Sequence, residues 1–377
     1  MTNKQTVKFG DICREVKLTT KDPIADGYER YIGLEHLDSG SLKIKRWGMI
    51  AEDNPSFTRV FKKGQILFGR RRAYLKKAGI AEFDGICSGD IIVMESKKND
   101  SFKPLVPYLI QSDRFWAWAV KNSAGGLSPR TKFKLLAEYE LLIPSNIDAA
   151  HALLAKSEDA LSYIESLRDS SDSMLYMSLK SLAGVNSNNL KEFVGSKKNW
   201  ELMKVRDCMQ ICNNARNPIS EADRKSIQGE FPYYGPTGIL DNLDHHNFDG
   251  QYVLIGEDGD HFLKYRTMPM TQLVSGKFNV NNHAHVLKGT ELVTTEWFYF
   301  YFLHAWIYKF LTRQGAGRYK LTKEALGAME IPVPPPSEQK QLVDCFFNIS
   351  RVKENSLEKE QRSKVLALVL RNELLGV

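Results

Sequence analysis

The feature that most constrains the fold is an internal repeat with a period of about 190 residues. Four fragments recur in the same order in both halves of the 377-residue chain. VKFGDICR pairs with MKVRDCMQ, FKKGQILFG with FDGQYVLIG, SAGGLSPRTKFKL with RQGAGRYKLTKEAL, and YELLIPS with MEIPVPP. Because four matches in one order are hard to obtain by chance, the repeat predicts that the two halves share one structural plan.

Each half ends in a proline stop that is followed at once by a helical pattern. The stops are Pro144 in the first half and the four prolines within Pro332–Pro336 in the second. Proline interrupts a helix interior but suits its first turn. Apolar residues then recur at helical spacing over about 36 residues in each half, or roughly 55 Å at 1.5 Å per residue.

Local signals predict how each long helix begins. In the first half Ser145 is expected to cap the helix, with Asp148 three residues on and able to reach back to free amides. In the second half Ser337 is the expected cap, with Glu338 and Gln339 in the first turn.

Helices of this length need a partner for the apolar face. If the second helix packs on the first, the order of the parts requires an antiparallel pair with a globular region at each end, related by a pseudo-twofold axis. The alternative, from the residues alone, is two ordinary domains that each pack their own helix.

The globular regions carry a strand signal with few helices. QILFG, GIAEFDGICSGDIIVM, QYVLIG and HAHVL are short, rich in β-formers and bounded by glycine or aspartate. Helices are expected late in each region, at residues 105–122 and 297–311. The pattern predicts a mixed α/β or α+β domain.

Composition sets broad limits on function. The chain is 42% hydrophobic and 26% charged, with a net charge of +7, which suits a polyanionic partner without requiring one. The N-terminal stretch lacks the apolar core of a secretory signal, and the apolar stretch at 294–311 is aromatic and contains charged residues, so a buried helix is expected there. Five scattered cysteines are typical of reduced thiols, and a cytoplasmic location is expected.

Cations cluster where the strands turn. GRRRAYLKK at Gly69–Lys77 holds five cations and a tyrosine, and arginine can fork onto phosphate or guanine. The loops GGLSPRTK and RQGAGRYK combine glycines with cations, which suits phosphates, although neither has the form of a nucleotide-binding loop. The alternatives are a solvated hairpin and, for the glycines, a helix C-cap with a tight turn.

Several tempting sites lack the pattern that their chemistry needs. Cys208 and Cys212 have no second ligand pair for zinc, and the adjacent His245 and His246 diverge. IGEDGDH lacks the spacing of a calcium loop and is expected to form a turn, with a recognition role through its carboxylates as a hypothesis. The chain also lacks the Asp/Asn-Pro-Pro-Tyr/Phe tetrapeptide of amino-methyltransferases, H-E-x-x-H, and G-x-S-x-G, which favours a binding component over an enzyme.

The chain resembles the specificity subunits of type I restriction–modification systems. The resemblance covers both halves and is carried by both proline-to-helix junctions and by YIGLEHL, ILFGRRRAYLKKAGIAEFDGICSGDI, FPYYGPTGILD, FDGQYVLIGEDGD and VNNHAHVL. It implies an α+β fold with two similar target-recognition domains joined by two long conserved helices packed as an antiparallel coiled coil. The domains would span 1–145 and 188–336, and the helices would lie within 146–187 and 337–377.

The resemblance also implies a function without catalysis in this chain. Each domain would read one half of a split, asymmetric DNA target, with the helices setting the unread spacer. Two modification subunits would methylate adenine from S-adenosylmethionine, and restriction subunits would add ATP- and Mg-dependent translocation and cleavage. No cofactor is expected on this chain. Two alternatives are a methyltransferase or nuclease component with unrecognised motifs, and a helical scaffold without a DNA role.

Ten cations are predicted to contact DNA, most of them at phosphates rather than bases. The first domain would contribute Arg70, Arg71, Arg72, Lys76 and Arg130. The second domain would contribute Lys264, Arg266, Arg313, Arg318 and Lys320.

Overall fold

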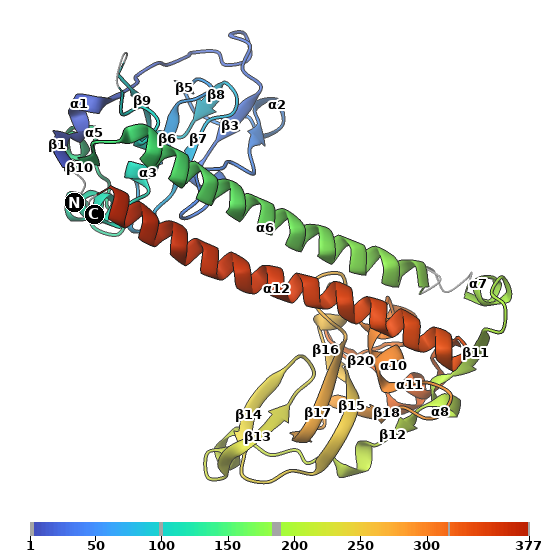
Figure 1. Ribbon diagram of the computed structural model, residues 1–377. Coiled ribbons are helices and arrows are strands. Elements are labelled where there is room, and N and C mark those ends of the chain that lie inside the picture. The colour runs from blue at the N-terminus through green and yellow to red at the C-terminus, as the bar shows by residue number, and fades with distance from the viewer. Residues whose placement is uncertain (1–3, 98–100, 183–189, 316, 376–377) are drawn as a thin grey trace. The chain divides into compact units, whose positions relative to one another are not determined.

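The computed structural model describes residues 4–97, 101–182, 190–315 and 317–375 (Figure 1). The chain divides into two compact units, one formed by residues 1–165 with 358–377 and the other by residues 166–357. Each unit holds one globular domain and one half of each long helix.

The two domains open with the same three elements. In the first domain they are β1 (Lys4–Lys8), α1 (Phe9–Ile12) and β2 (Cys13–Glu15). In the second they are β11 (Glu201–Lys204), α8 (Val205–Cys208) and β12 (Gln210–Ile211). The first strand of each set pairs antiparallel with the strand that precedes the long helix, β10 (Glu140–Pro144) or β21 (Glu330–Val333). The ends of each repeat therefore meet in a two-stranded sheet.

The main sheets share a strand order as well. The first domain has β2-β9-β6-β7, with β6 at Ile66–Gly69, β7 at Ala78–Ile80 and β9 at Ile91–Ser96. The second has β12-β18-β15-β17, with β15 at Phe248–Gly256, β17 at Thr271–Val280 and β18 at Ala284–Lys288. Every pairing in both series is antiparallel. The predicted repeat and the predicted strands are confirmed at the level of topology.

The domains differ in what surrounds this shared sheet. The first adds a sheet of order β4-β3-β8-β5, formed by Gly48–Met49, Arg30–Ile32, Gly85–Cys87 and Arg59–Phe61. The second extends its sheet with β13 (Gln228–Tyr234) and β14 (Ile239–Leu243), and adds a small sheet β16-β20-β19 from Asp258–Gly259, Tyr319–Lys320 and Thr312–Arg313. Short helices complete the domains at Ile50–Asp53 (α2), Leu190–Gly195 (α7) and Glu221–Arg224 (α9).

The helices that precede the proline stops are shorter than predicted. The segment 105–122 forms α3 (Val106–Ile110) and α4 (Asp113–Lys121), because Ser112 accepts from the amide of Phe115 and starts a new helix. The aromatic run forms α10 (Thr295–Phe302), so its predicted continuation to residue 311 is wrong, and a single 3-10 turn follows at Tyr308–Phe310. Then α5 (Phe133–Ala137) and α11 (Lys323–Ala328) occupy equivalent positions before β10 and β21.

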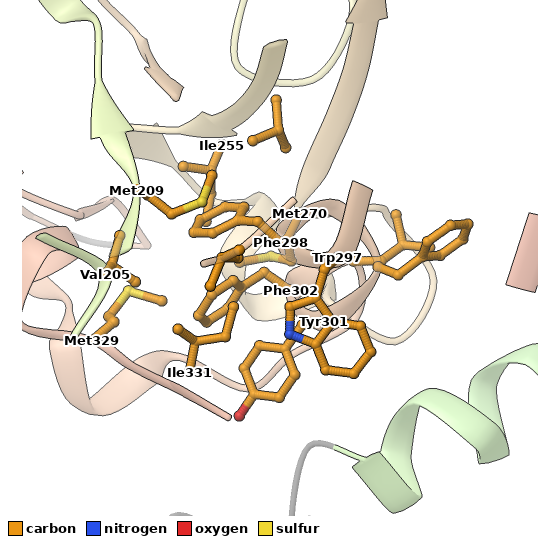
Figure 2. Packing of buried hydrophobic residues seen from close by; sticks show 14 of the residues in the cluster. Val205, Met209, Ile255, Met270, Trp297, Phe298, Tyr301, Phe302, Met329 and Ile331 are labelled. Atoms are coloured by element: carbon orange, nitrogen blue, oxygen red, sulfur yellow. The ribbon is translucent and has the colours of Figure 1, made fainter. Parts of the chain in front are cut away.

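The core of the second domain forms around α10. Trp297, Phe298 and Phe302 are almost fully buried, and they lie among Val205, Met209, Ile255, Met270, Tyr301, Met329 and Ile331 (Figure 2). The Trp297 indole also donates from Nε1 to the carbonyl of Pro332 at 2.9 Å. This bond ties α10 to the proline stop from which the long helix starts.

The two long helices are α6 (Ile147–Leu182), which lies within the predicted segment, and α12 (Pro336–Leu374), which begins one residue before the predicted segment. In the first unit Arg371 pairs with Glu158 at 3.1 Å and Lys364 with Glu165 at 3.9 Å. Residue numbers rise on one helix as they fall on the other, so this packing is antiparallel, as predicted. Residues 183–187, which were assigned to the first helical segment, lie outside the described residues. The predicted bounds of the two domains and the two helical segments stay a prediction.

The predicted helix caps are wrong. Asn146, not Ser145, caps α6, since its Oδ1 accepts from the amide of Ala149 at 3.0 Å. Helix α12 begins at Pro336, and Ser337 lies inside its first turn. There the backbone carbonyl of Pro335 accepts from the amides of Glu338 and Gln339, both at 2.9 Å.

The helical periodicity predicted an apolar face that is buried on each long helix, but the structure buries only part of that face. Ala150, Leu154, Leu175 and Leu179 are buried as expected. Other apolar residues of α6 and α12 stay exposed, including Leu153, Tyr163, Leu167, Met174, Met177, Val352, Leu357, Val365, Leu366 and Val369. Among the described residues, no helix combines the length and the apolar character needed to cross a membrane.

Candidate nucleic-acid interface

The arginine-rich stretch of the first domain is a tight connection between β6 and β7. Arg72 and Lys76 both adopt positive φ, +53° and +49°, on either side of a 3-10 turn at Ala73–Leu75. The amide of Gly69 donates to the carbonyl of Lys77 at 2.9 Å and closes the loop. Two left-handed non-glycine residues in one loop are uncommon, so the loop conformation is held by its surroundings.

Asp90 binds one cation of this loop, Arg71, and a second cation, Arg130, from the loop before α5. It lies in the turn between β8 and β9, and its carboxylate accepts from Arg130 Nε at 2.6 Å and Nη2 at 3.3 Å. Arg71 Nη1 reaches the same carboxylate at 3.4 Å. The Arg130 guanidinium, through this hydrogen bond, is the main cause that holds the pKa of Asp90 below its usual range. Asp90 is therefore ionised at neutral pH and fixes two of the five predicted cations.

Hydrogen bonds to the backbone of Thr131 hold Arg70 next to Arg130. Its Nε donates to the carbonyl of Thr131 at 3.1 Å, and the amide of Thr131 donates to the carbonyl of Arg70 at 3.0 Å. The structure thus brings together Arg70, Arg71 and Arg130.

The other two predicted cations of this domain differ from these three. Lys76 donates to Asp113 Oδ1 at 2.7 Å and lines a pocket of about 530 Å³ beside the long helices. Arg72 is exposed, and within the described parts of the chain its side chain has no hydrogen-bond or ion-pair partner. It is the most available cation of the loop.

The second domain has an equivalent arrangement with different residues. The amide of Leu321 donates to the carbonyl of Glu257 at 2.7 Å, which matches the bond between Thr131 and Arg70. Lys320, at the position equivalent to Arg130, pairs with the Glu257 carboxylate at 3.2 Å. Arg216 Nη1 donates to the same carboxylate at 2.7 Å. Each domain therefore pairs its equivalent cation, Arg130 or Lys320, with a carboxylate.

Glu257 stays ionised despite its burial. Burial acts to raise its pKa, but hydrogen bonds from Arg216 and Lys320 and the charge of Arg216 outweigh it, so the pKa of Glu257 lies below its usual range. Since two cations face one carboxylate, this cluster carries a net positive charge.

Arg313 and Arg318 lie with Lys320 on the hairpin of β19 and β20. Arg313 Nε donates to the carbonyl of Gly315 at 3.2 Å, while Arg318 is exposed. Among the residues that the structure describes, the Arg318 side chain has no recorded partner. These three predicted cations share one small sheet.

The structure does not group the last two predicted cations with this hairpin. Lys264 donates to Asp260 Oδ2 at 2.7 Å within its own turn. Arg266 lies over the ring of Tyr265 and lines a second pocket, of about 590 Å³, with Asp169, Asp172 and Lys353 of the long helices. Their contact with DNA stays a prediction.

The other sequence candidates are engaged in local structure. The aspartates of IGEDGDH have local partners: Asp258 lies 2.8 Å from His283 Nδ1, and Asp260 pairs with Lys264. Burial raises the pKa of the Cys208 thiol to about 11. Within the described ranges, no group of three or more histidine, cysteine, aspartate or glutamate side chains could hold a metal ion.

Sequence reasoning missed Asp90 and Arg216, and it singled out Glu257 only as part of an acidic turn. Asp90 lies 40 positions from Arg130, and Arg216 lies 41 positions from Glu257. No local pattern marks such pairs, because the fold alone brings them together.

Comparison with known proteins shows what the chain is similar to. Residues 197–367 match the family model described as the type I restriction modification DNA specificity domain. A Haemophilus influenzae protein named as a type I restriction enzyme specificity subunit is 36% identical over 149 residues. Over these residues the chain is similar to the specificity subunits of type I restriction–modification systems.

A second relative extends the comparison. The specificity subunit of the type I restriction enzyme EcoDI of Escherichia coli is 25% identical over 166 residues, or 44% of this chain. The match to the H. influenzae protein covers 40% of this chain, and each match spans only 36% of the relative's own length.

Solved structures cover nearly the whole chain and support the fold. The crystal structure of the S subunit of a type I restriction–modification system from M. genitalium has a TM-score of 0.61 at 14% identity, and it covers 99% of this chain and 96% of that one. A chain from a structural study of complex assembly and conformational transition of the type I R-M system has a TM-score of 0.57 at 17% identity, covering 98% and 97%. At these identities, the similarity shows a shared fold across both domains and the long helices.

Proposed function

We propose that this chain is the DNA-recognition subunit of a type I restriction–modification complex. Each of its two domains reads one half of a bipartite, asymmetric target, and the long helices set the unread spacer between the halves. The chain directs partner subunits to methylate adenine or to restrict the DNA, and it performs no catalysis itself.

The observation that carries the proposal is the equivalent placement of Arg130 and Lys320. Both cations lie directly before the last short helix of their domain, and both are held by a carboxylate that is ionised at neutral pH. A shared frame with different loop residues is what two heads need in order to read two different half-sites.

The length of the long helices supports the spacer role. Helix α6 has 36 residues and α12 has 39, so each spans more than about 50 Å at 1.5 Å per residue. One turn of B-DNA is about 34–36 Å. A helix pair of this length suits half-sites that are separated by at least one turn.

The exposed apolar residues of α6 and α12 support protein partners. Tyr163 and Val365 are 67% and 63% exposed, and Met174 and Met177 are 61% and 60% exposed. Apolar side chains gathered on helices are typical of association surfaces. Since both units have such residues, we propose that two modification subunits dock on the helices, one at each unit, and that restriction subunits join them. S-adenosylmethionine, ATP and Mg would then bind to those partners.

Binding and methylation assays test the proposal against its alternatives. The purified chain is expected to bind duplex DNA with an affinity that falls steeply as salt rises. It should transfer no methyl group from labelled S-adenosylmethionine without partner subunits. Methyl transfer by the chain alone would favour a methyltransferase component, and the absence of DNA binding would favour a helical scaffold.

A further inference from the structure

Three aromatic rings form a row on the second domain, at Trp306, Tyr308 and Tyr319. The rings of Trp306 and Tyr308 are stacked, with centroids 6.3 Å apart and an interplanar angle of 9°. The ring of Tyr308 lies 5.2 Å from that of Tyr319, and the two hydroxyl oxygens are 3.2 Å apart. We call these three residues the aromatic row.

The aromatic row faces solvent to an unusual degree. Trp306 is 51% exposed and Tyr308 is 44% exposed, while Trp297 on the preceding helix is 1% exposed. Large rings normally gain most of their stabilisation from burial. Neighbouring rings that stay exposed but ordered by mutual stacking indicate a binding surface.

The charge around the row favours a polyanion. Residues 305–320 contain Lys309, Arg313, Arg318 and Lys320 and no carboxylate. Arg313 lies close enough to Tyr308 to act on the pKa of its hydroxyl, although the hydrogen bond with Tyr319 dominates and raises that pKa. Glu257 pairs with Lys320 at 3.2 Å, so the positive charge beside the rings comes chiefly from Lys309, Arg313 and Arg318. The core of a protein–protein interface is typically depleted in lysine, so rings among these cations fit nucleic acid better.

We infer that the aromatic row and its flanking arginines contact one strand of duplex DNA in the half-site of the second domain. The rings would pack against deoxyribose and exposed base edges, and Arg313 and Arg318 would take the adjacent phosphates. The inference rests on the proposed function and adds to it a group of uncharged contacts that the predicted cations do not supply.

Salt dependence separates the rings from the cations. The probe is a fluorescein-labelled duplex of about 30 base pairs, or three helical turns, titrated with the full chain at several salt concentrations. Trp306→Ala should weaken binding roughly tenfold at every salt concentration and leave the slope of log K against log salt unchanged. Arg318→Gln should instead reduce that slope by about 0.9, because one phosphate contact is lost.

A matched control comes from the long helix. Tyr163→Ala removes a ring that is 67% exposed on α6 and should leave DNA affinity unchanged. Thermal melting checks that each variant remains folded, and Tyr308→Ala provides a second variant of the row with the same expected loss as Trp306→Ala.

Fluorescence gives an independent readout. Trp47→Phe removes the tryptophan of the first domain that is 43% exposed, and Trp306 then dominates the emission that acrylamide can quench. Saturating duplex should protect this emission from acrylamide.

The outcomes are distinguishable. If the unmodified chain binds the duplex but Trp306→Ala and Tyr308→Ala bind equally well, the inference is wrong while the proposed function stands. If these variants retain DNA binding but fail to co-purify with the modification subunits, the row is a protein-docking surface and the inference is again wrong. If the unmodified chain does not bind duplex at all, both fail.

Discussion

Arg130 donates from Nε to Asp90 Oδ1 at 2.6 Å and joins the loop before α5 to the turn before β9. The pair is partly exposed, with 45% of the Arg130 side chain and 20% of the Asp90 side chain accessible. Water and salt screen an exposed ion pair, so this pair contributes little to the stability of the fold. Its main effect is to orient a guanidinium and to place a negative charge beside the expected path of DNA.

Removing that charge should strengthen non-specific DNA binding. In Asp90→Asn the amide oxygen can still accept from Arg130, but the repulsion between the carboxylate and phosphates is lost. We expect roughly threefold tighter binding of a mixed-sequence duplex at low salt, measured by anisotropy. The control is Asp84→Asn, which removes the same charge from the pair with Lys62 in the same domain. Equal effects from both variants would contradict a local role for Asp90.

Among the polar residues where β21 joins α12, Gln339 should contribute most to the free energy of unfolding. Its side chain is 1% exposed, Nε2 donates to the carbonyls of Leu292 and Pro334 at 2.7 and 2.9 Å, and Oε1 accepts from the amide of Thr294 at 3.2 Å. Gln339→Ala leaves all three backbone groups unsatisfied and should cost about 2–3 kcal/mol of unfolding free energy. Denaturant melts monitored within the second unit, for example by tryptophan fluorescence, measure this loss.

Ser337 provides the matched control for that experiment. It lies two positions before Gln339, is exposed, and is not the cap of α12. Ser337→Ala should change the unfolding free energy by less than about 0.5 kcal/mol. A larger loss from Ser337→Ala than from Gln339→Ala would contradict the described junction.

His285 should make the second domain sensitive to acid. Its ring is 1% exposed; Nε2 donates to the carbonyl of Leu321 at 2.7 Å and Nδ1 accepts from Asn213 Nδ2 at 2.8 Å, so the ring is neutral. Burial is the main cause that lowers the pKa of His285, even though Glu257 opposes it. Because the unfolded chain then takes up the proton first, stability falls as pH drops below about 6.5, the value for an unperturbed histidine.

Melting temperatures at pH 7.5 and 5.5 measure this effect. His285→Gln should reduce the difference between the two temperatures. His245→Gln should not, because His245 is exposed and its carboxylate partner is the adjacent Asp244. An unchanged difference in His285→Gln would show that other groups control the acid response.

The exposed apolar residues of the long helices should control subunit stoichiometry. Met174 belongs to the second unit and Val365 to the first. Met174→Lys or Val365→Lys should each leave a complex with one modification subunit, and the double variant should bind none, as measured by mass photometry after co-expression. Ser170→Lys, which adds the same charge at an exposed polar position of α6, should keep both subunits. Full assembly of the double variant would contradict docking on these residues.

The sequence predicted those parts of the fold that depend on local pattern or on repetition. The proline stops located the starts of α6 and α12 to within a residue, because proline limits the backbone directly. The ordered fragments predicted equivalent strands, and the pairing of β6 with β9 and of β15 with β18 confirms them.

The parts that could not be predicted depend on contacts between distant residues. Asn146 rather than Ser145 caps α6 because only the folded loop decides which side chain faces the free amides. The apolar pattern of α6 does not tell whether Leu175 or Met174 finds a partner inside the chain, and only Leu175 is buried. Likewise, the cations of the β6–β7 loop were identified as a group, but only the structure shows that Arg71 pairs with Asp90, that Lys76 pairs with Asp113 and that Arg72 faces solvent.

Mapping of methylated adenines tests the central claim most directly, which is that one chain reads two half-sites with two domains. Cells that carry the chain with its modification subunits should show methylation at a bipartite motif with a fixed unread gap. Arg72→Ala should degrade only one half of that motif and Arg318→Ala only the other. A contiguous motif, or variants that affect both halves equally, would contradict the account.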